Sequence, residues 1–256
     1  MTASPQQEVA TVAQLDPAAA AVGRPVAEYA LRAALKRTLD IVGAVVALVI
    51  LAPVFALIAL LVVIDSPGPV FFRCERAGFQ GRRLRMLKFR KMHSDATGGL
   101  LTVANDARLT RVGTWLVRLK LDELPQLWHV LRGDMSLVGP RPESPDFVLR
   151  FDADYRQILR VRPGMTGFTQ LAFAREGRIL DPRDPCGHYV RALLPQKVML
   201  DRLYAARPSV RRDLAILVAT LATVALRVPF AVNRTTGALS LRRRPARGAA
   251  DGGRFA

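Results

Sequence analysis

The polarity pattern of the chain is dominated by one long apolar run. Residues Ile41 to Ile64 form 24 consecutive uncharged positions, nearly all of them apolar, between Asp40 and Asp65. As a straight helix this run reaches about 36 Å, which is enough to enter or cross a bilayer. Leaving so many large apolar side chains in water costs roughly 1.5 to 3 kcal/mol each. The run therefore predicts a membrane-embedded helix; the alternative is a helix at the centre of a soluble core, which the remaining chain is too small and too polar to enclose.

The middle and the flanks of this run indicate how it lies in the membrane. Pro53 removes one backbone hydrogen bond halfway along, which predicts a kink or a break. Basic residues occur on both sides, whereas a spanning helix carries its excess on the cytoplasmic side only. We therefore predict a re-entrant helix-break-helix over residues 31–66 with both ends at the cytoplasmic face, and a simple kinked span stays open. The flanking cations are Arg32, Lys36 and Arg37 before the run and Arg73, Arg76, Arg82, Arg83 and Arg85 after it.

Beyond the run the pattern alternates between short strands and helices. Residues 70–72 and 85–89 predict two strands joined through Gly78 and Gly81, which is a small β-hairpin. The expected fold is α+β and mainly helical, with interfacial helices beside the hairpin. Helical patterns cover residues 110–120 and 123–131, and the 13 apolar residues 214–226 fit an interfacial or buried helix.

Both ends of the chain lack sustained periodicity. Residues 1–30 are rich in Ala, Val, Pro and Gln and predict a disordered leader, which does not fit a signal peptide because the apolar run begins too late. Residues 234–256 contain three consecutive arginines beside Gly and Ala and predict a basic disordered tail. Residues 67–233 are expected to form one domain at the cytoplasmic face.

Composition narrows the class of partner. The 38 Lys and Arg against 21 Asp and Glu give a net charge of +17 over 256 residues, which favours phospholipid headgroups, nucleic acid or phosphorylated small molecules. A low aromatic content and the lack of a recognised motif argue against nucleic acid. Cys74 and Cys186 have no metal-ligand spacing, and so few cysteines indicate a reducing compartment.

Two adjacent acids, Asp122 and Glu123, lie at the start of a predicted helix. The helix dipole favours an ionised carboxylate there, as a carboxylate nucleophile requires. Magnesium is commonly bound by one or two carboxylates plus substrate phosphates, so the same pair is the candidate metal site. The alternative is that Asp122 caps the helix and Glu123 complements its dipole.

Basic residues supply the complementary half of a phosphate site. The planar fork of arginine suits phosphate oxygens, and several cations here stand beside Pro and Gly turns that stiffen the backbone. An isolated basic residue is more often a solvated surface charge. The predicted phosphate-binding residues are Lys88, Arg90, Arg118, Arg141 and Arg162.

At these residues the chain resembles the monotopic polyprenyl-phosphate phosphoglycosyl transferases, a family of bacterial sugar transferases. The resemblance covers about residues 35–226. It implies a re-entrant membrane helix broken at Pro53 and a catalytic pair at Asp122 and Glu123, with Asp122 as the nucleophile. It also implies basic active-site positions at Lys88, Arg118 and Arg141. The segments that carry it are Lys88–Met92, Leu121–Trp128, Gly133–Pro142 and Arg162–Gly167.

The resemblance also implies an activity. We expect transfer of a phospho-sugar from a UDP-sugar to polyprenyl (undecaprenyl) phosphate, with Mg²⁺ as cofactor, release of UMP and a covalent aspartyl-phospho-sugar on Asp122, as the first step of exopolysaccharide or other surface-glycan synthesis. The expected location is the bacterial inner membrane. Membrane lipids are expected partners, nucleic acid is not, and a homodimer is possible. The alternatives are a basic membrane-associated binding protein without catalysis and a structural membrane partner with degenerate motifs.

The chain departs from the family at three positions. Val117 stands where relatives often have a second arginine, Cys74 where glutamine is usual, and Ala52 where serine commonly precedes the proline. Residues 175–188 are too individual to name a sugar. Large relatives carry further transmembrane helices before this core, so a chain with only a short leader is expected to be a minimal form.

Overall fold

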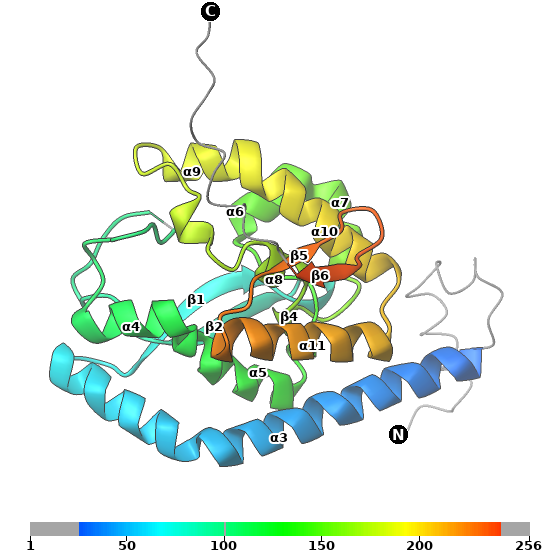
Figure 1. Cartoon of the computed structure of the whole chain (residues 1–256), viewed down its shortest axis with the longest axis horizontal. Coiled ribbons are helices and arrows are strands. Elements are labelled where there is room, and N and C mark those ends of the chain that lie inside the picture. Colours follow the sequence, from blue (N-terminus) through cyan, green and yellow to red (C-terminus); the bar gives the residue numbers. More distant parts are fainter. Residues whose placement is uncertain (1–25, 100, 242–256) are drawn as a thin grey trace, which may run out of the picture.

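A single long helix, α3 (Val26–Asp65), forms one side of the protein, and the other elements pack along it (Figure 1). The computed structural model describes residues 26–99 and 101–241. The mainly helical α+β class predicted from the sequence is confirmed. The other α-helices are α4 (Arg111–Leu119), α5 (Leu127–Arg132), α6 (Pro145–Val148), α7 (Asp152–Ile158), α8 (Phe168–Ala172), α9 (Pro185–His188), α10 (Leu194–Ala206) and α11 (Val210–Ala225). The strands are β1 (Phe71–Ala77), β2 (Arg83–Phe89), β3 (Ser136–Val138), β4 (Gly164–Thr166), β5 (Phe230–Val232) and β6 (Leu239–Leu241). Short 3₁₀ or π segments are η1 (Phe79–Gly81), η2 (Leu121–Gln126), η3 (Leu149–Phe151), η4 (Glu176–Arg178) and η5 (Tyr189–Leu193).

The helix α3 continues through Pro53, and Figure 1 shows that it bends in its middle part. A bend in a continuous helix therefore replaces the break predicted at this residue. A proline removes one hydrogen bond and crowds the preceding turn, and a helix can accommodate both effects by bending. The helix also begins before the predicted end of the leader at residue 30, and residues 1–25 lie outside the described part of the chain.

The apolar side chains of α3 point mostly away from the rest of the protein. The helix is long and apolar enough to cross a membrane, and only 11% of its most apolar 18-residue window is buried. Val49, Ile50 and Ile64 are each about two-thirds exposed. A core helix of a soluble protein would bury such side chains. The exposed apolar surface of α3 therefore favours lipid over a protein core as its environment.

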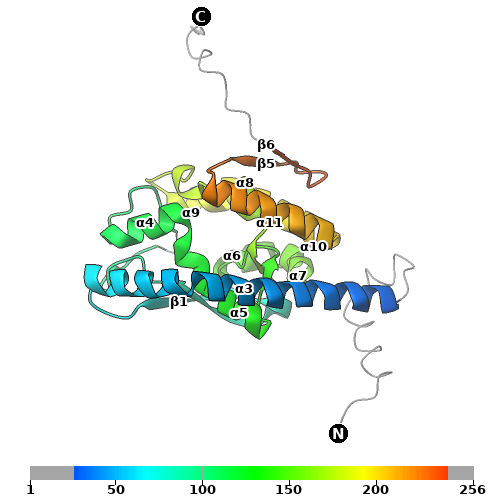
Figure 2. The ribbon, with the colours of Figure 1, turned by 60° about the horizontal axis from the view of Figure 1, so that its bottom comes forward.

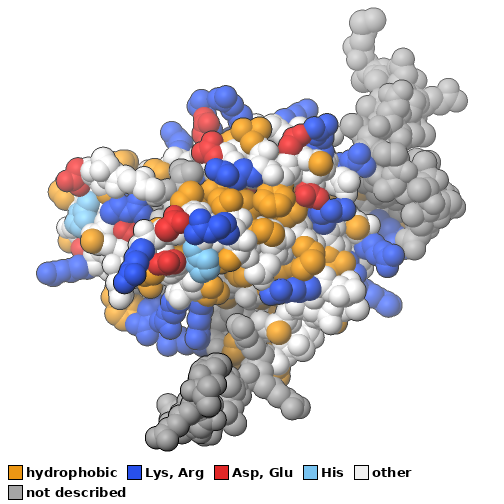
Figure 3. Space-filling model, turned by 90° about the horizontal axis from the view of Figure 1, so that it is seen from above, with side chains coloured by type: hydrophobic (Ala, Val, Ile, Leu, Met, Phe, Trp, Pro, Cys, Tyr) orange, Lys and Arg blue, Asp and Glu red, His pale blue; other side chains and the backbone are white. Residues whose placement is uncertain are grey.

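Polar contacts attach both halves of α3 to the same body of the protein. In its first half, Asp40 accepts hydrogen bonds from Ser136 Oγ and from the backbone N–H of Leu137, both at 3.0 Å. At its end, Asp65 accepts the backbone N–H of Val112 at 2.8 Å. Figure 2 shows the helix lying along one side of the protein, opposite the β5–β6 hairpin. The face turned away from α3 carries many Lys and Arg side chains with acidic ones among them (Figure 3).

The predicted hairpin is confirmed as the antiparallel pair β1 and β2, with Phe71 opposite Phe89. Its turn contains Gln80 (φ 56°) and Gly81 (φ 75°), both in the left-handed region that glycine tolerates best. Alternate side chains of a strand share a face. The buried face of β2 carries Leu84, Met86 and Lys88 in turn. The third buried side chain on this face is therefore a lysine and not an apolar residue.

Two glycines cross at very short range beside the parallel strands, where Gly139 follows β3 and Gly164 begins β4. The backbone N–H of Gly139 donates to the carbonyl of Thr166 at 2.9 Å, and that of Gly164 donates to the carbonyl of Pro140 at 2.8 Å. A Cβ atom on Gly164 would lie 2.0 Å from the backbone nitrogen of Gly139. Only glycine fits there. The two glycine-proline segments of the sequence are thus one structural unit, and Arg141 follows directly from it.

The C-terminal part of the described chain corrects the prediction of a disordered tail from residue 234. Residues 230–232 and 239–241 pair as β5 and β6, and Phe230 and Leu239 pack against the apolar cluster around Phe168. The intervening turn is closed by Asn233, whose Oδ1 accepts two backbone N–H groups at 2.9 Å. Local side-chain bonds of this kind stabilise turns that hydrophobic periodicity does not reveal. Residues 242–256 lie outside the described part.

The guanidinium group of Arg90 closes the C-terminal end of α3. It is 6% exposed, and it donates to the carbonyl of Pro69 at 2.7 Å, to Ser66 Oγ at 3.0 Å and to the carbonyl of Ser66. The last carbonyls of a helix have no partner within it, and Arg90 supplies one. The structure therefore places this predicted phosphate ligand in the junction between α3 and β1.

Replacing Arg90 is expected to loosen this junction. Arg90→Met should lower the free energy of unfolding by about 3 kcal/mol, because several buried acceptors lose their donor together. Arg85→Met, which removes an exposed arginine from β2, the strand just before Arg90, should change it by less than about 0.5 kcal/mol. Thermal unfolding of both purified variants in detergent measures the difference, and equal melting temperatures would contradict the role assigned to Arg90.

Candidate active site

The two adjacent acids lie in the 3₁₀ turn η2, which links α4 to α5. Lys120 ends α4 in the left-handed conformation (φ 60°) and is also the N-cap of η2, without a side-chain cap bond. Pro125 has no N–H to donate, so the helix predicted from residue 123 starts only at Leu127. The prediction that the two acids begin an α-helix is therefore wrong, and so is the alternative that Asp122 caps it. The side chains of both acids contact cations instead.

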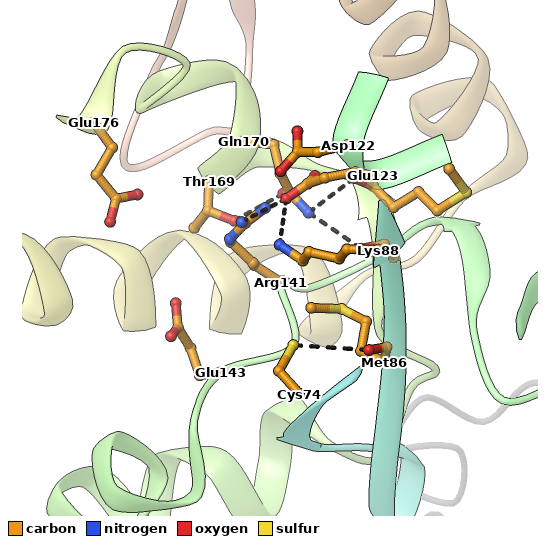
Figure 4. Close-up of polar contacts among 12 residues, drawn as sticks. Cys74, Met86, Lys88, Asp122, Glu123, Arg141, Glu143, Thr169, Gln170 and Glu176 are labelled. Atoms are coloured by element: carbon orange, nitrogen blue, oxygen red, sulfur yellow. Dashed lines mark hydrogen bonds and ion pairs between the residues drawn. The ribbon is translucent and has the colours of Figure 1, made fainter. Parts of the chain in front are cut away.

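Two cationic side chains contact the same carboxylate oxygen of Glu123. Its Oε1 accepts from Lys88 Nζ at 2.9 Å and from Arg141 Nη2 at 3.0 Å (Figure 4). The second acid, Asp122, is 3% exposed and its Oδ2 lies 3.4 Å from Lys91 Nζ. The five side chains come from β2 and the residues just after it, from η2, and from the segment that follows β3. Three predicted site residues besides Asp122 are thus brought into one contact set.

The charges of this cluster act on one another strongly. Burial by itself would raise the pKa of Glu123, but the positive charges of Arg141 and Lys88 outweigh it and hold the pKa well below its ordinary value. Burial lowers the pKa of Lys91, and the negative charge of Asp122 opposes that effect. The set contains two carboxylates and three cations, so an ionised substrate such as a diphosphate would meet a surplus of positive charge.

Lys91 was not among the residues predicted for the site. Strand alternation puts residues 88 and 90 on one face and residue 91 on the other, but β2 ends at Phe89 and the chain then turns. Lys91 consequently faces Asp122 while Arg90 faces the end of α3. Two lysines and an arginine within residues 88–91 marked the segment as basic, although only the turn determines which of them point to the acids.

Arg118 and Arg162 are not brought to the acids by side-chain contacts. Arg118 is exposed on α4 and lies over the ring of Trp115, 5.6 Å from its centroid. Arg162 donates to the carbonyl of Gly133 at 2.9 Å and lies over the ring of Phe79. Their predicted phosphate contacts remain predictions.

Asp122 and Glu123 are the carboxylates that could hold a metal ion. The described residues include no group of three or more His, Cys, Asp or Glu side chains arranged for a metal. Magnesium needs fewer protein ligands, because it commonly takes one or two carboxylates and completes its shell with substrate phosphates and water. Both cation contacts of Glu123 use Oε1. Its second oxygen and the carboxylate of Asp122 therefore fit such an ion, and magnesium stays a prediction.

Comparison with known proteins assigns the family. The family model described as bacterial sugar transferase matches residues 31–227, which include most of α3, the acid pair and the crossing glycines. The chain belongs to the bacterial sugar transferase family. Similar curated proteins include an undecaprenyl-phosphate glucose phosphotransferase of Komagataeibacter xylinus, 39% identical over 77% of this chain and 37% of that protein. A UDP-glucose:undecaprenyl-phosphate glucose-1-phosphate transferase of Caulobacter vibrioides is 38% identical over 73% of this chain and 68% of its own length.

A third relative carries a different sugar in its name. The UDP-N-acetylgalactosamine-undecaprenyl-phosphate N-acetylgalactosaminephosphotransferase of Aeromonas hydrophila is 44% identical over 54% of this chain and 34% of its own length. The chain thus spans about a third of the length of two of these relatives and about two thirds of the Caulobacter protein. The chain is about equally identical to relatives that are named for different sugars. Overall sequence identity therefore does not indicate which sugar this bacterial sugar transferase uses.

A further buried carboxylate, Asp201 of α10, lies behind Arg141. Asp201 is 1% exposed, and its Oδ1 accepts from Thr169 Oγ1 at 3.1 Å. Its Oδ2 has no hydrogen-bond partner among the described residues. Burial raises the pKa of Asp201 to about 8, the charge of Glu143 adds to the rise, and the bond from Thr169 opposes it.

Asp201→Asn is expected to make stability less dependent on pH. The pKa of Asp201 is 3.8 in an ordinary setting and about 8 in the folded protein, so between these values the folded state keeps a proton that the unfolded state has lost. The free energy of unfolding of the wild type should therefore fall as pH rises through this window, by about 1.4 kcal/mol per pH unit relative to the variant. Melting temperatures should diverge from about pH 5 to about pH 8 and then stay parallel; a pH-independent difference would contradict the assignment.

Proposed function

We propose that the protein transfers a phospho-sugar from a UDP-sugar to polyprenyl phosphate, at the surface of the bacterial inner membrane. The observation that carries the proposal is the contact set of Asp122, Glu123, Lys88, Lys91 and Arg141 on a domain attached to an exposed apolar helix. The named relatives act with undecaprenyl phosphate and, in two names, with a UDP-sugar. Both substrates carry phosphate groups, and the cations of the site are suited to bind phosphate.

In the first half of the reaction, a carboxylate oxygen of Asp122 attacks the sugar-bearing phosphorus of the donor. The bond from this phosphorus to the bridging oxygen breaks, and UMP leaves with that oxygen. Asp122 is almost excluded from water, and a poorly hydrated carboxylate is the better nucleophile. Lys88 and Arg141 already converge on Glu123 and are placed to share the charge of the phosphate oxygens.

In the second half, a phosphate oxygen of the lipid acceptor attacks the same phosphorus. The bond to Asp122 breaks, the carboxylate is restored, and the product is a polyprenyl diphospho-sugar. The acceptor phosphate stays in the headgroup layer because its apolar tail stays in lipid. The site must therefore lie at the membrane surface. Magnesium bound at Asp122 and Glu123 would neutralise part of the diphosphate charge.

The attachment of α3 supports a re-entrant position in the membrane. A straight span would carry one of the two ends to the far side of the bilayer, together with its polar contacts to the domain. Asp40 and Asp65 are both bonded to one body, and most of the apolar positions between them are not buried. The exposed apolar residues Leu214, Val218 and Leu221 of α11 suit an interfacial helix. We infer that both ends of α3 face the cytoplasm.

Asp122→Asn should abolish UMP release, because an amide cannot form the acyl phosphate. Purified wild-type protein with polyprenyl phosphate, Mg²⁺ and a panel of UDP-sugars should release UMP with at least one donor. A donor radiolabelled in its sugar should also label the wild-type protein when acceptor is omitted, but not the variant.

The matched control is Asp146→Asn, which changes an exposed aspartate of α6 and should retain turnover and labelling. Unimpaired turnover by Asp122→Asn would exclude the covalent mechanism. Binding of UDP-sugar without UMP release from any donor would instead favour the alternative of a binding protein without catalysis.

The membrane position of α3 can be tested by cysteine labelling. With Cys74 and Cys186 replaced by serine, single cysteines are introduced at Ala34 and at Arg73, on either side of the apolar run. Both should react with a membrane-impermeant maleimide in inverted vesicles and neither in intact spheroplasts. Reaction of the two positions from opposite sides would establish the kinked span instead.

A further inference from the structure

A buried cation that the proposed chemistry does not use lies behind Arg141. Lys197 of α10 is 1% exposed. Its Nζ lies 2.7 Å from Glu176 Oε2, 3.0 Å from Tyr189 Oη and 3.6 Å from Glu143 Oε1. A lysine is seldom buried so completely unless its charge is compensated. Here two carboxylates share one ammonium group.

The same two carboxylates are close enough to act on Arg141. Glu123 raises the pKa of Arg141 most, and the negative charges of Glu176 and Glu143 raise it further, against the effect of burial. In Figure 4, Glu143 and Glu176 lie on the opposite side of Arg141 from Lys88. Three carboxylates thus compete for one guanidinium group, yet among the described residues its side-chain hydrogen bond goes to Glu123, at 3.0 Å.

We propose that Lys197 is a positioning residue that, as the counter-ion of Glu143 and Glu176, leaves Arg141 directed at Glu123 and at the donor phosphate. Removing the ammonium group would leave two carboxylates without their cation. A buried or half-buried carboxylate without a partner is costly, and Arg141 is the cation that both already attract. Its guanidinium would then turn away from Glu123. The inference rests on the proposed function.

The helix that carries Lys197 also holds the backbone from which Arg141 projects. Tyr204, seven residues further along the same face of α10, donates to the carbonyl of Val138 at 3.0 Å. Between them on this face lies Asp201, and the backbone N–H of Arg141 opposes the rise in its pKa. One face of α10 therefore contacts the segment from Val138 to Glu143 along its length. A substitution at Lys197 can therefore affect the position of Arg141 through direct contacts of α10 with this segment.

The test begins with Lys197→Met, which keeps much of the side-chain length and removes the charge. We expect kcat/KM for UMP release to fall about 10- to 100-fold, as small misplacements of a phosphate-binding group do. The matched control is Arg202→Met, which removes a cation of α10 whose partner is Asp154, at 2.7 Å. This control should stay within about 2-fold of the wild type, because an exposed ion pair contributes little.

A double-mutant cycle separates positioning from a general loss of structure. If Lys197 acts through Arg141, the Lys197→Met change should alter kcat/KM by less than about 2-fold when Arg141 is already alanine. Additive losses would overturn the proposal. The same cycle is measured on the dissociation constant for UDP, which requires no turnover. A wild type that binds UDP but releases no UMP from any donor would count against the proposed function, while the UDP cycle still decides the role of Lys197.

A second variant keeps the test valid if Lys197→Met folds poorly. Lys197→Met/Glu176→Gln removes one carboxylate together with its cation, so less charge is left to attract Arg141. Glu176 lies at the edge of the cluster, with 23% of its side chain exposed, where an amide is tolerated. We expect the double variant to regain stability and at least part of the lost UDP affinity. A double variant that is folded but no better at binding UDP than Lys197→Met would overturn the proposal.

Discussion

The contact of Glu123 with Lys88 and Arg141 is the interaction on which the site depends. A largely buried carboxylate is unfavourable as an ion unless cations compensate it, and here two cations reach the same oxygen of Glu123. The cations come from β2 and from the segment after β3, so the contact draws three separate parts of the chain together. Asp122, the neighbour of Glu123, is placed by the same arrangement and faces Lys91.

The backbone structure positions these charged side chains. The β-hairpin turns Lys88 inward at a position where its strand neighbours are apolar, and the crossing of Gly139 with Gly164 brings the next segment close. Buried groups of α10 support that segment from behind. Rigid elements with satisfied contacts hold a phosphate-binding group better than a mobile loop does. The site is therefore a product of packing as much as of its own residues.

The relation of α3 to the domain is the second constraint. Its exposed apolar surface favours lipid, while Asp40 and Asp65 attach it to polar partners on the domain. The proposed re-entrant position, with the domain resting on the membrane and the helix entering from that side, would meet both requirements. In the proposed function, such a position brings the carboxylates to the level of the lipid phosphates, where a long-chain acceptor can present its own phosphate.

Some of this could be obtained from the residues alone, because it depends on local chemistry. The apolar run, the hairpin with its glycine turn, the acid pair and the glycine-proline segments are patterns within short stretches, and each was found in the fold. The directions of the charged side chains depend on distant partners. Arg90 faces the end of α3, and Lys91 faces Asp122 because β2 ends at Phe89 and the chain then turns.

The same division applies to the rest of the molecule. The length of the apolar run was sufficient for the long helix, whereas the β5–β6 hairpin was not predicted because its stability comes from packing on Phe168 and from one asparagine turn. The partnership of Lys197 with Glu143 and Glu176 joins residues far apart in the chain, and no spacing rule connects them. Local conformational preferences depend on neighbouring residues, whereas the pairing of buried charges is determined only when the whole chain packs.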